Sequence, residues 1–478
     1  MSVKWTVCLL LTGLSYAQLN SLLQSPADAP VDSNPWRNEL KSVTHGGPAA
    51  PELQTAQQMP SQGLPSPQVG SPQAMRLSVK DAEGLALKNN PQITSARLSA
   101  LAAHQVTREA RSSLWPQAYV DLTGVDSSEG SRISAGALNN PIIYERAAYG
   151  ATVSQLITDF GHTTNLVAST RLQEKAQDQN ALATKEQILL ATDQAFYGVL
   201  QARAVLQVAK QTVDSRQLLS DQVTALAKSK LKSDLDVSFA NVNLAQAKLL
   251  LLDAQNNEQA ALASLSAILG YATLQTFELV EDDQQLASPP ADVSQLISEA
   301  LTVRPEILAA TFEYESAQKL HIANRDLMFP SINALGAVGQ APVRNDNLSS
   351  WYGAVGVNVQ IPVFNGFLYP AKSKETDLRA QAAQERLMDL RNRIVRDVRT
   401  SWLNVNTVYQ RLSVTQQLLT QANLALDLAQ TRYNLGLGSI VELSQAQLQQ
   451  TQAQISNAQA GYDYRVAEAI LLYQTTGI

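Results

Sequence analysis

The 478-residue sequence is poor in cysteine, in charged residues and in aromatic residues. Its single cysteine is Cys8, so the chain forms no intrachain disulfide, and thiol-based metal or redox chemistry is excluded beyond the first residues. Charged residues make up 16% of the chain and aromatic residues 6%, whereas about 25% charged residues is usual in globular domains. Uncharged polar and small side chains must therefore cover much of its surface.

The sequence also lacks a strongly basic region and a long hydrophobic run. It has 36 Lys+Arg against 42 Asp+Glu, and this mildly acidic balance argues against nucleic acid as a partner. No segment approaches the roughly 20 consecutive apolar residues of a membrane-spanning helix. If a membrane is involved, the chain must cross it in another way.

The N-terminal part divides into two segments. Residues 1–17 resemble a secretory signal peptide, with Lys4 before an apolar run and the small residues Ser15 and Ala17 near a cleavage point. The alternative is a frayed apolar terminus. Residues 18–75 hold nine of the 19 prolines, which interrupt helices and central strands, so we expect a disordered or extended arm rich in Pro, Gln and Ser.

The rest of the chain contains one series of motifs twice. The landmarks are ALKNNPQI and ALTVRPEI at 86–93 and 300–307, the prolines Pro116 and Pro330, YGA segments beginning at Tyr149 and Tyr352, and the segments LKSDLDV and LGSIVEL beginning at Leu231 and Leu437. They recur in the same order at an offset of about 200 residues. We therefore predict a tandem duplication, with repeats at 76–277 and 278–478.

Each repeat is predicted to begin with helices and to continue with strands. Capping-box patterns at 78–81 and 292–295 begin the first helices, and prolines end them. The hydrophobic period then changes to two. The predicted strands are 117–131 and 147–158 in the first repeat and 331–342 and 350–363 in the second. In the last strand one face carries Trp351, Val355, Val357 and Val359, and Tyr352 lies on the other.

A long helix without proline follows each pair of strands, over 162–228 and 371–435. At 1.5 Å per residue each would be about 100 Å long. The second has a heptad pattern that includes Val398, Val405 and Leu412, as in a coiled coil. We predict that a second helix runs back from the end of each, so that each repeat contains one helical hairpin.

The strands have the length that crosses an outer-membrane hydrocarbon layer when tilted. Four strands cannot close a barrel, however, and open sheet edges are not tolerated in lipid. If the strands enter a membrane, several chains must share one barrel. The alternative is a soluble antiparallel sheet that caps the helices.

On the motifs ALKNNPQI, YGAVGVNVQIPVFNG and RYNLGLGSIVELSQAQ, residues 77–478 resemble the outer membrane efflux proteins, the TolC-like channel-tunnels. The resemblance implies a mainly α fold with a small β part: a homotrimer whose twelve strands form one barrel in outer-membrane lipid, continued by a periplasmic α-helical coiled-coil barrel. It implies the exit duct of a tripartite efflux pump or type I secretion system for small molecules or proteins. The implied partners are a periplasmic adaptor (membrane fusion) protein and an inner-membrane pump, and no cofactor or metal is implied.

The resemblance also implies a gate at the periplasmic helix tips. Tyr433 and the turn glycine Gly436 match the family's tip motif, Asp236 matches a carboxylate that binds the tyrosine, and Glu442 matches a ring carboxylate. A Tyr433–Asp236 hydrogen bond and a ring of three Glu442 are therefore expected, and such a ring favours cations. The alternative is that Asp236 and Glu442 only solvate a helix tip.

Two positions depart from the family pattern at this gate. Gly438 stands where the family has an arginine, and Gln445 replaces a second ring carboxylate. The resemblance therefore implies a closed state that is held by different contacts from those of the family.

Other protein classes fit less well. The four histidines have no metal-ligand spacing, and the chain has no phosphate loop or GxSxG motif, so we do not expect an enzyme. A secreted coiled-coil filament subunit would not need a signal peptide or duplicated strands. A periplasmic adaptor would carry one helical hairpin rather than two.

Overall fold

The computed structural model describes residues 75–126, 146–281, 286–341 and 349–476, all within the compact unit Ser71–Ile478. The predicted signal peptide at 1–17, the arm up to residue 74, and the predicted strand residues 127–131 and 342 lie outside the described residues. No helix in the described part combines the length and hydrophobicity that crossing a membrane would require.

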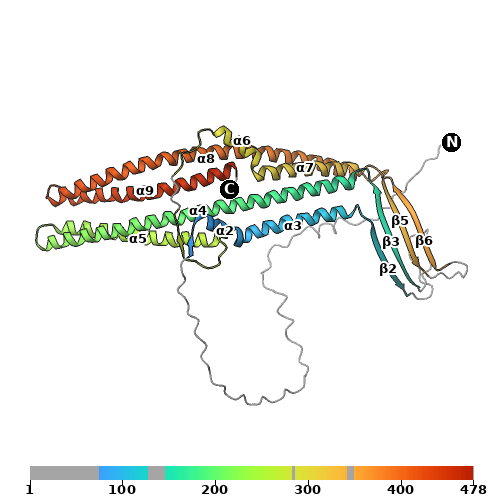
Figure 1. The fold of residues 1–478 in the computed structure, drawn as a ribbon, viewed down its shortest axis with the longest axis horizontal. Helices are drawn as coiled ribbons and strands as arrows, with labels where there is room; N and C mark the ends of the chain where they lie inside the picture. The colour runs from blue at the N-terminus through green and yellow to red at the C-terminus, as the bar shows by residue number, and fades with distance from the viewer. Residues whose placement is uncertain (1–74, 127–145, 282–285, 342–348, 477–478) are drawn as a thin grey trace, which may run out of the picture. The chain divides into compact units, whose positions relative to one another are not determined.

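The same order of elements occurs twice along the chain (Figure 1). The first set is β1 (Met75–Leu77), α2 (Val79–Asn89), α3 (Pro91–Ser112), β2 (Gln117–Val125), β3 (Arg146–Thr158), α4 (His162–Lys228) and α5 (Asp234–Ile268). The second set is β4 (Phe277–Leu279), α6 (Val293–Val303), α7 (Pro305–Asp326), β5 (Ser331–Gln340), β6 (Trp351–Gln360), α8 (Leu368–Asn434) and α9 (Ile440–Thr475). The long helices α4 and α8 have 67 residues each.

Prolines set several of these helix boundaries. Pro91 and Pro305 each occupy the first turn of the helix that follows, where a missing N–H costs nothing. Pro370 likewise lies in the first turn of α8, which begins at Leu368 and not at the predicted residue 371. Pro362 cannot donate a ladder hydrogen bond, and β6 ends at Gln360, before the predicted residue 363.

The N-terminal caps of the two short helices differ. Ser78 and Asp81 form the predicted capping box at the start of α2. At α6, Asp292 accepts a hydrogen bond of 2.8 Å from the backbone N of Ser294, and no reciprocal bond from Gln295 is present in the described residues. The capping box predicted there is wrong, because the aspartate carboxylate caps the second residue of the helix instead.

Strands β2, β3, β5 and β6 form one antiparallel sheet in the order β2-β3-β5-β6, and the short strands β1 and β4 pair in parallel as a separate two-stranded sheet. The repeats meet in its centre, where β3 pairs with β5. Strands β2 and β6 are its edges and have one hydrogen-bonded neighbour each among the described residues.

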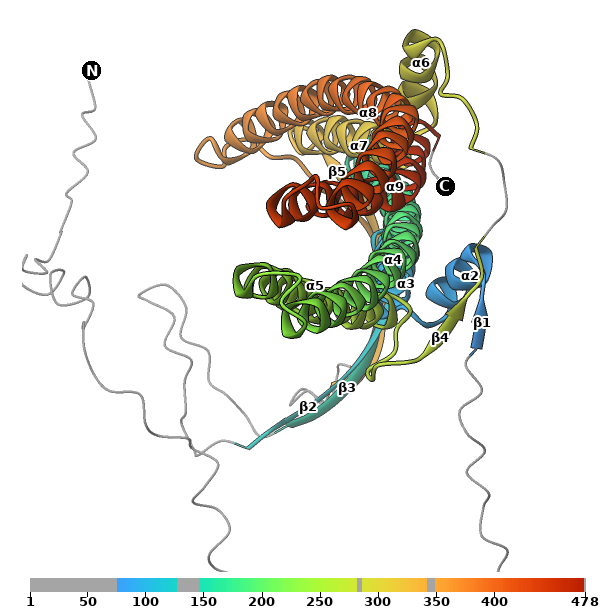
Figure 2. The ribbon, with the colours of Figure 1, turned by 90° about the vertical axis from the view of Figure 1, so that its left-hand side faces the viewer.

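The helices form two hairpins, in which α4 packs along α5 and α8 packs along α9 (Figure 2). Helix α4 also contacts α9, so the hairpins of the two repeats touch. The heptad seam of α8 is buried at Ile394, Val398 and Val405. Near the hairpin ends, Leu219 and Val223 of α4 pack in one cluster with residues of α8 and α9.

One carboxylate in α4 is buried without adequate compensation. Asp193 is 7% exposed, and its Oδ1 has no hydrogen-bond partner among the described residues. Burial raises the pKa of Asp193 to about 7, with a further contribution from the charge and hydrogen bond of Glu83 in α2. The folded chain therefore holds a proton here that the unfolded chain releases near pH 4.

We expect the contribution of Asp193 to the stability of the fold to decrease as the pH rises from about 4 to 7, and Asp193→Asn to remove this contribution to the pH dependence. Each unit by which folding raises a pKa corresponds to about 1.4 kcal/mol, so the variant should unfold at a higher temperature than the wild type at pH 8 and close to it at pH 4. Thermal unfolding followed by circular dichroism measures this, with Asp214→Asn on the exposed side of α4 as the control. If both variants changed the unfolding temperature equally at pH 8, the assignment of a raised pKa to Asp193 would be contradicted.

Candidate functional site

The hairpin tips are two similar turns that differ in detail. In each, a serine caps the returning helix: Ser233 accepts from the backbone N of Asp236, and Ser439 from that of Glu442. The turn between α8 and α9 contains Gly436 in the left-handed conformation, with φ of 75°. A glycine adopts this conformation without a Cβ clash, which explains Gly436 by turn geometry.

The carboxylate of Asp236 belongs to the cap of its own helix. Its Oδ2 accepts hydrogen bonds from the backbone N of Ser233 at 3.0 Å and from the Ser233 hydroxyl at 2.8 Å. This capping box stabilises the start of α5.

Tyr433, at the end of α8, packs between the two tips. It is 3% exposed and lies in a cluster with Val223, Ala240 and Leu443. Its hydroxyl has no hydrogen-bond partner in the described part of the chain, so the structure does not contain the predicted bond to Asp236. Burial raises the pKa of Tyr433, and the negative charge of Asp236 raises it further, which keeps the hydroxyl neutral.

Lys232, which the sequence patterns did not indicate, makes a contact between the tips of the two hairpins. The Nζ atom of Lys232 lies 3.7 Å from the centre of the Tyr433 ring and donates a hydrogen bond of 3.3 Å to the Tyr433 carbonyl oxygen. The cation thus contacts both an aromatic face and the C-terminal end of α8, two places that favour positive charge. Lys232 therefore links the tip of the first hairpin to that of the second.

Lys232→Gln should loosen the tips, while Lys232→Arg should preserve the contact. An exposed cation–π contact contributes about 1 kcal/mol, which corresponds to roughly a fivefold change in the ratio of open to closed tips. If the tips close a channel, as the resemblance implies, the resting conductance of the purified protein in planar lipid bilayers reports this ratio. Conductance of the glutamine variant equal to that of the wild type would show that Lys232 does not hold the tips.

Glu442 is paired within its own tip. The Nε atom of Arg432 lies 3.1 Å from Glu442 Oε1. Gly438 leaves space for this pair, because a Cβ there would lie 3.1 Å from Arg432 Cβ and 3.2 Å from Glu442 Oε2. The glycine at position 438 thus leaves room for Arg432 to pair with Glu442. Gln445 is exposed on α9, beyond Glu442.

The predicted membrane strand β6 is exposed on both faces in the single chain, and the side chains of its valines are among the exposed ones. Val355 is 93% exposed, and Val357 and Val359 are more than half exposed. The Trp351 ring packs edge-on against Tyr149, with ring centres 6.0 Å apart. Tyr352 lies over Gly339, where a Cβ would come within 2.7 Å of the tyrosine hydroxyl.

Two hairpin repeats that share one sheet and meet again at their tips define a duplicated fold of long helical hairpins joined to a small antiparallel sheet. The chain belongs to the outer membrane efflux protein family. The sequence model of this family matches residues 84–271 and 296–477, and each matched segment lies within one of the two repeats.

Similar proteins agree with this assignment. Outer membrane protein TolC of Escherichia coli (strain K12) is 24% identical over 398 residues, which cover 79% of this chain and 78% of that protein. Alkaline protease secretion protein AprF of Pseudomonas aeruginosa is 22% identical over 417 residues, 84% of each chain. In fold the chain resembles the crystal structure of CusC, with a TM-score of 0.73 at 21% identity, covering 84% of this chain and 92% of that one.

The chain is thus an outer-membrane protein of an efflux and secretion channel family, mainly helical with a small β part. These relatives are named as outer-membrane, secretion or channel proteins, which disfavours an enzyme, a filament subunit or an adaptor. In the described residues no cluster of His, Asp and Glu side chains is suited to hold a metal ion.

Proposed function

We propose that three copies of this chain form a channel-tunnel through the outer membrane. The observation that carries this proposal is the sheet, which in the described residues has four strands, two open edges and a row of exposed valines on one face of β6. Pairing of β6 of one copy with β2 of the next satisfies both edges, and three copies would close a barrel of twelve strands. The valine face would then contact lipid.

The helical hairpins extend this conduit into the periplasm. Their tips would dock on a periplasmic adaptor protein and an inner-membrane pump, which supplies the energy. The chain itself would provide the exit duct of a tripartite efflux pump or type I secretion system, for small molecules or proteins. The tip contacts of Tyr433, Lys232 and Arg432 support the assignment of the gate to this end.

Conductance in planar lipid bilayers tests this function. The purified full-length protein should form channels of small resting conductance, because the tips are fastened. Lipid bilayers that show no channels after insertion of correctly folded protein would contradict the proposal.

Charge at the tips should determine ion selectivity. Arg432 neutralises Glu442, so Arg432→Gln leaves one unpaired carboxylate in each copy and should increase the preference for cations. Glu442→Gln leaves the arginines unpaired and should reduce that preference below the wild-type value. Reversal potentials in a KCl gradient measure both changes, with the exposed Arg393→Gln on α8 as the control. If ion selectivity were unchanged in both variants, the tips would not line the conduction path.

A further inference from the structure

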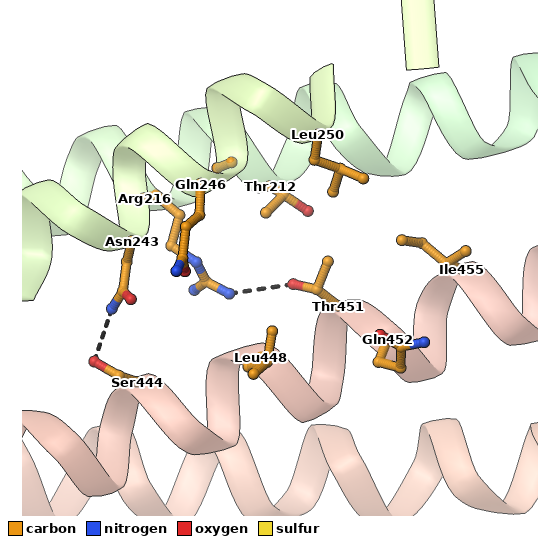
Figure 3. Close-up of a pocket in the computed structure, with 11 residues that line it drawn as sticks. Thr212, Arg216, Asn243, Gln246, Leu250, Ser444, Leu448, Thr451, Gln452 and Ile455 are labelled. Carbon is orange, nitrogen blue, oxygen red and sulfur yellow. Dashed lines mark hydrogen bonds between the residues drawn. The ribbon is translucent and has the colours of Figure 1, made fainter. Parts of the chain in front are cut away.

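A pocket of about 310 Å³ lies between the two hairpins (Figure 3). It is lined by residues of α4 and α5 on one side and of α9 on the other. Its polar lining consists of amides, hydroxyls and Arg216, and none of its lining residues is acidic.

Arg216 brings a buried positive charge to this pocket. It is 6% exposed, and its Nη2 donates hydrogen bonds of 2.9 Å to the Gln447 carbonyl oxygen and 3.2 Å to the Thr451 hydroxyl. Within the described residues no carboxylate pairs with it, and its Nε and Nη1 make no hydrogen bond. Burial lowers the pKa of Arg216 to about 10, so the guanidinium remains charged at neutral pH.

A buried charge without a counter-ion is unfavourable, because the two neutral acceptors replace only part of the lost hydration. The pocket offers room for a counter-ion beside the guanidinium. The amide of Gln246 is a further donor, and Leu250, Leu448 and Ile455 give the same pocket apolar walls. This combination of donors, one positive charge and apolar walls suits an anion with an apolar body.

We propose that this pocket binds a small organic carboxylate. Its carboxylate pairs with Arg216, and its apolar part lies against Leu250, Leu448 and Ile455. Such a ligand contacts α5 and α9 at once, and therefore ties the two hairpins together. The site is distinct from the tip contacts of Lys232, Tyr433 and Arg432 and does not depend on conduction.

Fluorine NMR on the purified full-length protein in neutral detergent tests the proposal, with 4-fluorobenzoate as the probe. The protein should broaden the resonance of 4-fluorobenzoate but leave that of the neutral analogue 4-fluorobenzamide sharp. Arg216→Gln should weaken 4-fluorobenzoate binding at least about tenfold, as expected for the loss of a charge-assisted hydrogen bond. Arg393→Gln, which removes an exposed arginine of α8, should leave binding unchanged.

A second variant covers the case in which Arg216→Gln does not fold. Gln246→Glu supplies a carboxylate in the same pocket, and should abolish probe binding while raising the unfolding temperature. Binding that Arg216→Gln leaves unweakened, binding that persists in Gln246→Glu, or no broadening by the wild type at millimolar probe overturns the proposal. Displacement of the probe by an equal concentration of chloride would also overturn it, because the site would then select inorganic anions.

Discussion

Val357→Arg should abolish the accumulation of assembled protein in the outer membrane. Val357 lies in the middle of edge strand β6, is 65% exposed, and belongs to the face that we assign to lipid. An arginine at the midplane of a membrane barrel costs about 2–4 kcal/mol, and a trimer would carry this cost three times. Outer-membrane fractions analysed without heating should show loss of the oligomer.

Asn358→Arg is the matched control. Asn358 is the next residue of the same strand, and its side chain points to the opposite face because side chains alternate along a strand. An arginine there would face the interior of the barrel and should be tolerated. If Asn358→Arg failed to assemble in the outer membrane while Val357→Arg assembled normally, the lipid face and the interior face of β6 would be the reverse of our assignment.

Tyr433→Ala should open the tips, whereas Tyr433→Phe should leave them closed. The tyrosine is buried among residues of both hairpins, and truncation of a large buried aromatic side chain costs about 3–5 kcal/mol. The alanine variant also loses the cation–π contact with Lys232. Resting conductance should therefore rise strongly in the alanine variant.

The phenylalanine variant separates packing from hydrogen bonding. Because the Tyr433 hydroxyl is buried without a partner in the described residues, its removal should be neutral or slightly stabilising. The ring and its contact with Lys232 remain. If Tyr433→Phe opened the channel as much as Tyr433→Ala, the hydroxyl must bind Asp236 in the closed channel, and the account of the tips would be wrong.

Much of the fold could be predicted because its signals are local. Prolines at 91 and 305 mark helix boundaries, and the change of period before β6 marks a strand within a few residues of its observed ends. The α8 heptad predicted a seam that is buried at Val398 and Val405. Each of these features depends on residues that are close together in the sequence, so the pattern of one sequence is enough to predict it.

The contacts between the hairpins and within their tips could not be predicted in the same way. Lys232 and the Tyr433 carbonyl are 201 residues apart in the sequence, and Arg216 and the Gln447 carbonyl are 231 apart. Whether these residues come into contact depends on the axial position and the rotation of one hairpin relative to the other. The Arg432–Glu442 pair is closer in sequence, but it needs the tight turn and the missing side chain at Gly438.

The stoichiometry of the protein extracted from the outer membrane tests the central claim most directly. Native mass spectrometry in detergent should give three copies of the 51.8 kDa chain, each shortened by the signal peptide that the sequence predicts. A trimer would show that the edge strands of neighbouring copies have partners. A monomer that carries four membrane strands, or a polymer that is soluble without detergent, would contradict the shared barrel and with it the channel.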